Sequence, residues 1–234
     1  MIERALIFAA GRGERMRPLT DATPKPLLKV AGKRLIEYHL ESLARAGVRD
    51  VVINTSHLAE QFPAALGDGS RWNLRIRYSY EGQTPLETGG GMRHALPLLG
   101  AAPFIAVNGD IFTNLDFSTL PQNPSGLAHL VVVDNPPQHL RGDFVLRGGW
   151  LYDEETPRLT FAGIGVYRPE LIAAHAPGRF PLAPLLREAM RAARISGEHH
   201  RGVWADIGTA QRLATLEADI LGERGVVRQD PQVG

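Results

Sequence analysis

The stretch that decides the fold is FAAGRGERMRPLTDATPKPLLKVAGKRLIEYHL, from Phe8 to Leu40. The apolar run at 4–8, which ends at the first residue of this stretch, predicts a buried strand. The spacing of apolar residues after Arg34 predicts a helix. A strand, a loop and a helix form the repeating unit of α/β proteins. Here the loop has about twenty residues, whereas such loops generally run about 2–6 residues and long ordered ones tend to be functional.

This loop is strongly basic, although the whole chain of 234 residues has a formal net charge of only +1. Between Gly11 and Arg34 the basic residues are Arg12, Arg15, Arg17, Lys25, Lys29, Lys33 and Arg34, and the acidic ones are Glu14 and Asp21. Positive charges held close together repel one another unless an anion lies among them, and a triphosphate would supply the counter-charge. The alternative is a solvated loop whose basic side chains pair with acids elsewhere.

Short apolar runs alternate with longer amphipathic segments along the rest of the chain, which predicts an α/β protein with a mostly parallel sheet. Strands are expected at 4–11, 50–56, 75–81, 102–110, 128–135, 159–169 and 198–208, with a hairpin at 143–154. Helices are expected at 35–48, 57–67, 89–100, 181–194 and 209–221, the last capped by Thr209. We expect one domain over 1–221 and a polar tail over 222–234 that frays.

Composition excludes several classes of function. The chain has no cysteine, so disulfides and thiolate metal sites are excluded. Its first residues do not resemble a secretory signal, and no run approaches the roughly 18 apolar residues of a membrane span. The basic segment contains no aromatic residue on which a nucleic-acid base could stack. We therefore expect a cytoplasmic protein that binds neither a membrane nor nucleic acid.

Two common phosphate-binding motifs can be tested against the glycines of the loop. The dinucleotide motif G-x-G-x-x-G fits Gly11 and Gly13, but its third glycine falls on Met16. The Walker motif fits Gly32 and Lys33, but the serine or threonine it requires is Arg34. Neither motif explains the loop.

The string GRGERMRPLT at 11–20, followed by PKPL at 24–27, resembles the signature of the sugar-1-phosphate nucleotidylyltransferases. This resemblance implies a Rossmann-like α/β fold, with helices flanking a mixed, mostly parallel central sheet. It also implies an enzyme that makes a nucleotide sugar and pyrophosphate from a nucleoside triphosphate and a sugar 1-phosphate. Arg15 and Lys25 would neutralise the phosphates and act in catalysis. The residues that would wrap the nucleotide are Ala10, Gly11, Gly13, Glu14, Arg15 and Lys25.

Two aspartates follow predicted strands, Asp110 in FIAVNGD and Asp206 in VWADIGT. An isolated aspartate at such a position is most often a turn former or a helix cap. In a parallel sheet, however, both would lie at the carboxyl edge, where ligands bind. The resemblance implies that Asp110 and Asp206 hold Mg²⁺, which is commonly bound by one or two carboxylates together with phosphate oxygens.

The resemblance also assigns residues to the base and the sugar. Gly82, Glu87 and Asn108 would contact the nucleotide, although Glu87 stands where many relatives have glycine in the string L-G-T-A-G. The motif LETGGG at 86–91, together with VDNPPQHLRGDF at 133–144, is most similar to a cell-wall recycling branch that uses UTP, with Asp143 near the sugar. Larger relatives grip the sugar phosphate with a Glu-Lys-Pro element that is absent here, and Arg141 is the candidate replacement.

Other functions stay open at this point. The nucleotide could be UTP, GTP or dTTP, and the sugar 1-phosphate could be that of a hexose or a heptose. A non-catalytic module that binds nucleotide sugars is a further alternative. The presence of all four expected catalytic and metal residues favours an enzyme. The sequence makes no prediction of the oligomeric state.

Overall fold

The computed structural model describes residues 1–222 of the chain. The tail predicted to fray therefore lies outside the described residues, apart from Gly222. None of the helices within residues 1–222 is long and apolar enough to cross a membrane.

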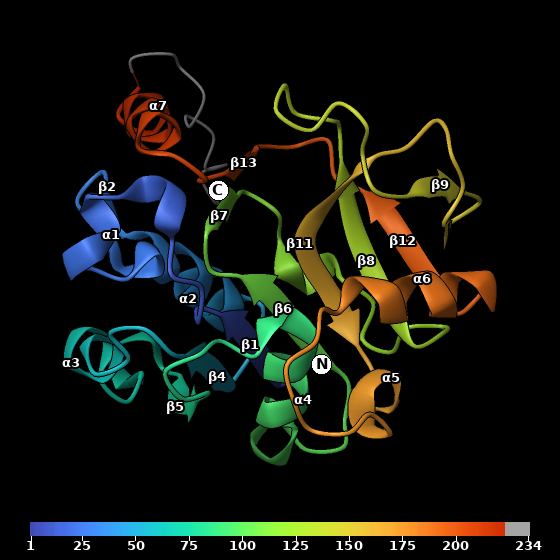
Figure 1. Cartoon of the computed structure of the whole chain (residues 1–234), viewed down its shortest axis with the longest axis horizontal. Coiled ribbons are helices and arrows are strands. Elements are labelled where there is room, and N and C mark those ends of the chain that lie inside the picture. The colour runs from blue at the N-terminus through green and yellow to red at the C-terminus, as the bar shows by residue number, and fades with distance from the viewer. Residues whose placement is uncertain (223–234) are drawn as a thin grey trace, which may run out of the picture.

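The centre of the fold is a mixed sheet, with nine strands among residues 1–222 (Figure 1). Their order is β5–β4–β1–β6–β11–β8–β12–β10–β9. Strands β5, β4, β1 and β6 are parallel, while β10 and β11 run against the others. The bounds are β1 Arg4–Phe8, β4 Asp50–Thr55, β5 Arg75–Tyr80, β6 Phe104–Asn108, β8 Ala128–Val133, β9 Val145–Arg147, β10 Trp150–Tyr152, β11 Thr160–Tyr167 and β12 Ile195–His199. The predicted α/β fold is confirmed, and so is the hairpin, which is β9–β10.

Helices cover both faces of this sheet. On one face, α2 (Leu35–Arg45) and α3 (Gln61–Leu66) pack their apolar residues onto the first strands, and Ile36, Leu40 and Leu43 are fully buried. The other face is covered by α4 (Glu87–Leu99), α5 (Glu170–Ala173) and α6 (Ala183–Arg191), which lie in front of the sheet in Figure 1. The 3.6-residue period of α2 produces its buried stripe, as the sequence predicted.

A third, smaller core joins the two ends of the chain. Helix α7 (Ala210–Ile220) lies beside β2 (Lys29–Val30), as Figure 1 shows, and β2 pairs with β3 (Lys33–Arg34). The Ala31 amide donates a hydrogen bond to Glu217 Oε1 at 2.9 Å. The Thr209 side chain accepts one from the Arg212 amide, which confirms the predicted cap. The buried members of this core are Met16, Val30, Leu35, Phe112, Ile207 and Leu216.

The basic segment is more ordered than the predicted loop. It contains 3₁₀ turns at Glu14–Met16 and Lys25–Leu27, the short helix α1 (Leu19–Ala22) and the β2–β3 hairpin. Further 3₁₀ turns lie at Ser70–Trp72 and Phe117–Thr119. Turns this short carry no repeating apolar pattern, so periodicity alone could not reveal them.

The final predicted strand, 198–208, is wrong as a single element. Its first residues belong to β12, and a separate strand β13 (Trp204–Asp206) pairs antiparallel with β7 (Ile111–Thr113) outside the main sheet. The chain turns at Gly202, where an added Cβ would lie 2.5 Å from Asn114 Oδ1. The same Asn114 oxygen accepts a hydrogen bond from the Val203 amide at 2.8 Å. This side chain redirects the backbone toward β7.

Helix α4 begins with three buried glycines that let another segment approach closely. The Gly90 amide donates to the Phe180 carbonyl at 3.0 Å, and the Phe180 amide donates to the Leu86 carbonyl at 3.1 Å. A Cβ added to Gly90 would overlap the Gly178 carbonyl oxygen. The segment between α5 and α6 can therefore lie directly on the start of α4.

We expect Gly90→Ala to lower the free energy of unfolding by about 1–2 kcal/mol, because overpacking against the Gly178 carbonyl outweighs the better helix propensity of alanine. Urea denaturation measures the change. Gly11→Ala is the control, since its added methyl group would meet no atom within 4 Å. A Gly90→Ala protein as stable as the parent would contradict the close approach.

Candidate active site

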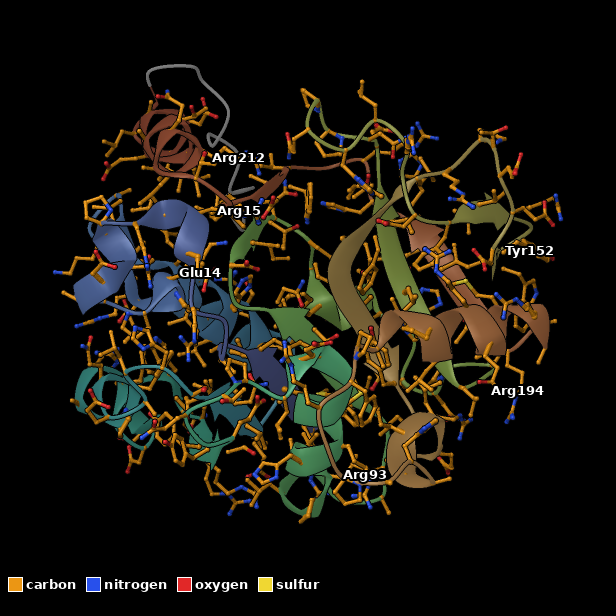
Figure 2. All side chains as sticks on the ribbon, viewed as in Figure 1. Glu14, Arg15, Arg93, Tyr152, Arg194 and Arg212 are labelled. Atoms are coloured by element: carbon orange, nitrogen blue, oxygen red, sulfur yellow. The ribbon has the colours of Figure 1, made fainter. Side chains whose placement is uncertain are left out.

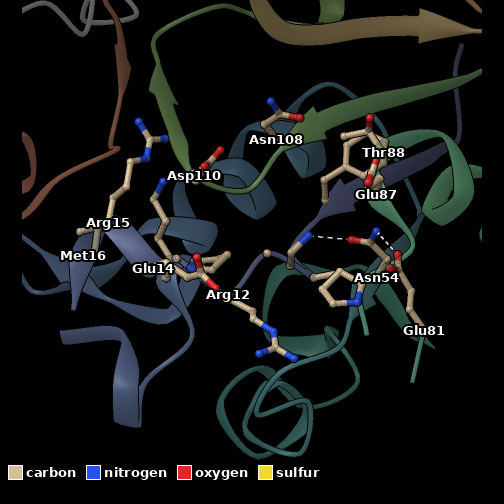
Figure 3. Close-up of a pocket in the computed structure, with 18 of the residues that line it drawn as sticks. Arg12, Glu14, Arg15, Met16, Asn54, Glu81, Glu87, Thr88, Asn108 and Asp110 are labelled. Atoms are coloured by element: carbon tan, nitrogen blue, oxygen red, sulfur yellow. Dashed lines mark hydrogen bonds and ion pairs between the residues drawn. The ribbon is translucent and has the colours of Figure 1, made fainter. Parts of the chain in front are cut away.

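A cavity of about 690 Å³ opens where β1, β4, β5 and β6 end (Figure 3). Phe8, Asn54 and Asn108 contribute to its wall from strand ends, and Glu81 follows β5 directly. Cavities of this volume are typical of sites for small molecules. The carboxyl edge of a parallel sheet is also the usual position for a ligand in α/β proteins.

Most of the residues predicted to bind the nucleotide line this cavity. They are Ala10, Gly11, Gly13, Glu14, Arg15, Lys25, Glu87 and Asn108, and the predicted metal ligand Asp110 joins them. Gly82 is not among the lining residues, although its neighbour Glu81 is. Asp206 is also outside the wall, but Gly208, two residues further on, belongs to it. The structure therefore brings together residues from the first strand, the basic segment, α4 and the end of β6.

Lys25 and Asp110 form an ion pair in the cavity. Lys25 Nζ donates to Asp110 Oδ2 at 2.7 Å, and Lys25 as a whole is only 7% exposed. Lys25 begins a 3₁₀ turn and lies between Pro24 and Pro26, which restrict the backbone around it. Asp110 occupies the turn between β6 and β7. A buried ammonium group at this position is available to an anion that enters the cavity.

Asp206 lies beside Asp110, although not through the parallel sheet that the sequence suggested. Asp206 ends β13 and pairs with Ile111 in the β7–β13 ladder. The Ile207 amide donates to the Asp110 carbonyl at 3.0 Å. The Asp206 carboxylate accepts from Arg212 Nη1 at 2.6 Å. The two aspartates therefore lie on adjacent backbone segments at the end of a small antiparallel ladder. Asp110 is paired with Lys25 and Asp206 with Arg212.

Arg15 approaches the same place from the glycine-rich turn. Gly13 adopts a left-handed φ of 65°, and its carbonyl accepts from the Met16 amide at 2.8 Å and from the Thr20 hydroxyl at 2.9 Å. This fixed turn directs Arg15 toward Gly208, where an added Cβ would lie 3.3 Å from Arg15 Nη1 and 3.2 Å from Asp206 Oδ2. Figure 2 shows Arg15 and Arg212 close to β13. A concentration of positive charge therefore faces the two carboxylates.

The donor set at Asp110 and Asp206 can be tested against Mg²⁺. Within residues 1–222, no group of three or more histidine, aspartate, glutamate or cysteine side chains could hold a metal ion. A cation held by protein groups alone does not fit this site. Two neighbouring carboxylates do fit Mg²⁺, because this ion keeps several waters and takes substrate phosphates as its other ligands.

The basic segment divides into two groups. Arg12, Arg15 and Lys25 line the cavity, and Arg12 donates across it to the Gln83 carbonyl at 3.3 Å. The others lie elsewhere: Arg17 pairs with Asp21 at 3.2 Å, Lys33 with Glu41 at 2.8 Å and Arg34 with Glu37 at 3.4 Å, while Lys29 is exposed. Three of the seven basic residues therefore line the cavity, and nearby acids neutralise three of the others.

The residues predicted to contact the sugar lie outside the first cavity. Asp143 accepts from the Phe161 amide at 2.8 Å and contacts His139 Nε2 at 3.0 Å, while Arg141 is exposed. A second cavity, of about 430 Å³, is lined by Asp206, Arg212, Trp204 and other residues of β13 and α7, together with Pro136 and Gln138. Those last two residues belong to the same loop as Arg141 and Asp143. The loop thus borders the second cavity, which includes Asp206, and does not line the first one.

Several lining residues were missed by the analysis of the sequence, among them Asn54, Glu81, Thr84, Thr88 and Arg179. Asn54 and Glu81 lie at the ends of the second and third strands, which is the rule that singled out Asp110. That rule points to both, but an isolated polar residue at a strand end is most often a turn former. Arg179 pairs with Glu87 at 3.0 Å from a distant segment, and nothing in the local sequence signals this contact.

His39, on α2, holds the strand that follows Asp110. It is fully enclosed on α2, and its Nε2 donates to the Ile111 carbonyl at 2.9 Å, directly next to Asp110. Burial lowers the pKa of His39 to about 4, although the hydrogen bond to Ile111 and the nearby Asp110 charge favour protonation. The imidazole is therefore neutral near pH 7 and fixes β7 against α2.

Comparison with known proteins agrees with this geometry. A family model described as nucleotidyl transferase matches residues 4–140. The chain is 50% identical over 224 residues to the N-acetylmuramate alpha-1-phosphate uridylyltransferase of Neisseria meningitidis, with 92% of this chain and 97% of that protein covered. It is 33% identical over 230 residues to the protein of the same name from Caulobacter vibrioides, with 92% and 95% covered.

Solved structures support the fold. A Bacillus anthracis protein assigned as a glucose-1-phosphate thymidylyltransferase superposes with a TM-score of 0.80 at 19% identity, covering 93% of this chain and 96% of its own. HddC from Yersinia pseudotuberculosis superposes with a TM-score of 0.76 at 20% identity, covering 94% and 100%. The chain belongs to the nucleotidyl transferase family, and within it is similar over nearly its whole length to N-acetylmuramate alpha-1-phosphate uridylyltransferases. The family resemblance identified in the sequence is confirmed.

The buried His39 predicts how stability depends on pH. Its pKa is about 4 in the folded protein against an ordinary value of 6.5, so the unfolded chain binds the additional proton first. Stability should therefore be complete above pH 6.5 and fall as the pH drops toward 4, by up to about 3 kcal/mol from this group. His39→Gln should flatten that part of the curve, measured by urea unfolding at several pH values. Equal slopes for parent and variant would refute the assignment.

Proposed function

We propose that this nucleotidyl transferase transfers UMP from UTP to N-acetylmuramate α-1-phosphate and releases pyrophosphate. The observation that carries the proposal is the meeting of the Lys25–Asp110 ion pair with Asp206 and Arg15 beside the cavity. The names of the two similar uridylyltransferases favour UTP and this sugar phosphate. A role in peptidoglycan recycling and a cytoplasmic location are part of the same proposal.

In the proposed reaction, an oxygen of the sugar phosphate attacks the α-phosphorus of UTP. A new phosphorus–oxygen bond forms as the bond to the β-phosphate oxygen breaks, and pyrophosphate leaves with the electron pair. The attacking phosphate is already an anion near neutral pH, so no side chain has to remove a proton. Catalysis of this kind depends on positioning and on neutralising charge.

Arg15 and Lys25 supply positive charge for this step. Both line the cavity, and Lys25 is buried, so its charge is screened less by water than that of an exposed lysine. As the pyrophosphate departs, these two side chains would stabilise the negative charge that grows on it. Asp110 and Asp206 would hold Mg²⁺, which when bound offsets charge on the phosphates and orients them.

The remaining predicted residues divide between the two substrates. Ala10, Gly11, Gly13 and Glu14 would surround the nucleotide, with Glu87 and Asn108 on the opposite wall. Gly82 stays a predicted nucleotide contact through its backbone. Fewer residues are assigned to the sugar: Asp143 and Arg141 would approach it through the loop that borders the second cavity.

Substrate choice is tested by combining UTP, GTP, dTTP and ATP with the 1-phosphates of N-acetylmuramate, N-acetylglucosamine, glucose, mannose and a heptose. Pyrophosphate release is the readout. We expect the highest kcat/KM with UTP and N-acetylmuramate α-1-phosphate. A preference for another pair would replace the substrates but keep the reaction. If no pair turns over while a nucleotide sugar binds, the chain is a binding module.

We expect Asp110→Asn and Asp206→Asn each to lower kcat by about 10²-fold or more, because each removes a proposed ligand of the activating cation. Activity of the parent should vanish with a chelator and return when Mg²⁺ is added. Asp21→Asn is the matched control, since Asp21 is exposed, pairs with Arg17 and does not line the cavity. Near-normal turnover in either site variant would rule out the metal assignment.

A further inference from the structure

A series of buried hydrogen bonds runs along the cavity wall formed by Asn54 and Glu81, and those of Asn54 are drawn with dashed lines in Figure 3. The Ala9 amide donates to Asn54 Oδ1 at 2.6 Å, and Asn54 Nδ2 donates to Glu81 Oε1 at 2.5 Å. The Leu86 amide donates to the other carboxylate oxygen, Glu81 Oε2, at 2.7 Å. Asn54 is 2% exposed and Glu81 is 9% exposed.

These hydrogen bonds join four segments of the protein that are distant in sequence. Ala9 follows β1 and opens the turn that carries Ala10 to Gly13, while Asn54 belongs to β4. Glu81 follows β5, and Leu86 is the residue just before α4. The two side chains therefore tie the nucleotide-binding turn to the start of α4, so the width of the cavity between them depends on these three bonds.

The environment of Glu81 is costly for a carboxylate. Burial raises its pKa, against the opposing effect of the hydrogen bonds from Leu86 and Asn54. In the described part of the chain, no lysine or arginine forms a salt bridge with it. Gly91 of α4 packs so closely that an added Cβ would overlap Glu81 Oε1. An apolar pair could not replace Asn54 and Glu81, because it would leave the amides of Ala9 and Leu86 without acceptors.

Direct contact with a nucleotide is the other role that a wall residue could have. Both oxygens of Glu81 already accept a hydrogen bond from the protein, and both polar atoms of Asn54 are engaged. A base would find only the second lone pairs of these oxygens and the second hydrogen of Asn54 Nδ2. The arrangement favours holding the wall over touching the ligand.

We infer that Glu81 and Asn54 are positioning residues. They set the width of the cavity where the nucleotide would bind, by holding the turn after β1 against the start of α4. This inference rests on the proposed function, because it assigns the cavity between these segments to the nucleoside triphosphate. This role requires both Asn54 and Glu81. Because the backbone amides of Ala9 and Leu86 are donors at the two ends, the side chains between them must offer an acceptor at each end and one donor–acceptor contact in the middle.

That order permits a test by exchange. In Glu81→Gln, the new amide can satisfy either Leu86 or Asn54 but not both, since two donors meet at the other contact. In Asn54→Asp, two carboxylate oxygens meet. In the double variant Asn54→Asp/Glu81→Gln, the new carboxylate accepts from the Ala9 amide and from the new side-chain amide, whose own carbonyl accepts from Leu86. All three hydrogen bonds return, with the net charge unchanged.

We expect each single variant to raise KM for UTP by about tenfold, because one buried hydrogen bond is replaced by a repulsive contact. KM for the sugar 1-phosphate should stay near that of the parent, which separates positioning from general damage to the fold. The exchanged double variant should recover the parent KM for UTP. Glu60→Gln/Asn123→Asp is the matched control, since both residues are exposed and outside the cavity.

Three results would overturn the inference: single variants with the parent KM for UTP, a double variant as impaired as the singles, or equal rises in KM for both substrates. Where a single variant does not fold, the comparison of the double variant with the parent still decides. If the parent shows no transfer from UTP, the proposed function fails separately. Calorimetric affinity for the nucleoside triphosphate that the parent binds best then replaces KM in the same comparison.

Discussion

The candidate site depends on Asp110 and Asp206 being held on adjacent backbone segments. The short β7–β13 ladder supplies the constraint, since Asp206 pairs with Ile111 and the next amide binds the Asp110 carbonyl. Lys25 and Arg212 each neutralise one acid. His39 fixes β7 from the opposite side. A ladder this short has little stability of its own, so these side chains and the core around Phe112 and Ile207 are needed to maintain it.

The N-terminal basic segment serves the site in two ways. Arg12, Arg15 and Lys25 contribute charge to the cavity, while Met16 and Val30 belong to the small core that also contains Leu216 of α7. The acids beside Arg17, Lys33 and Arg34 neutralise charges that face away from the cavity. Positive potential is thereby concentrated on one side of a segment whose overall charge is spread along its length. The prolines around Lys25 keep this division of roles fixed.

Much of this arrangement could be predicted from local patterns. A few consecutive residues are enough to predict the strands β1 and β6 from their apolar runs, the helix α2 from its period and the helix cap at Thr209. The separation of β13 from β12 could not be found in this way, because the partner strand β7 is distant in the sequence and a single asparagine side chain turns the chain toward it. Asn54 and Glu81 escaped notice because one polar residue at a strand end has an ordinary explanation as a turn former. Their meaning depends on each other, and only the tertiary fold brings them together.

The small core between β2 and α7 has a consequence for the order in which the molecule is made. Synthesis runs from the N-terminus, so a growing chain has the glycine-rich turn, Lys25 and Asp110 long before β13 and α7 emerge. Until then Asp110 lacks its companion acid, and the apolar side of the β2–β3 hairpin has no cover. A ribosome-bound or prematurely terminated polypeptide would thus possess most of the residues that line the first cavity but would lack Gly208. The ion pair between Asp206 and Arg212 can form only after α7 has been synthesised.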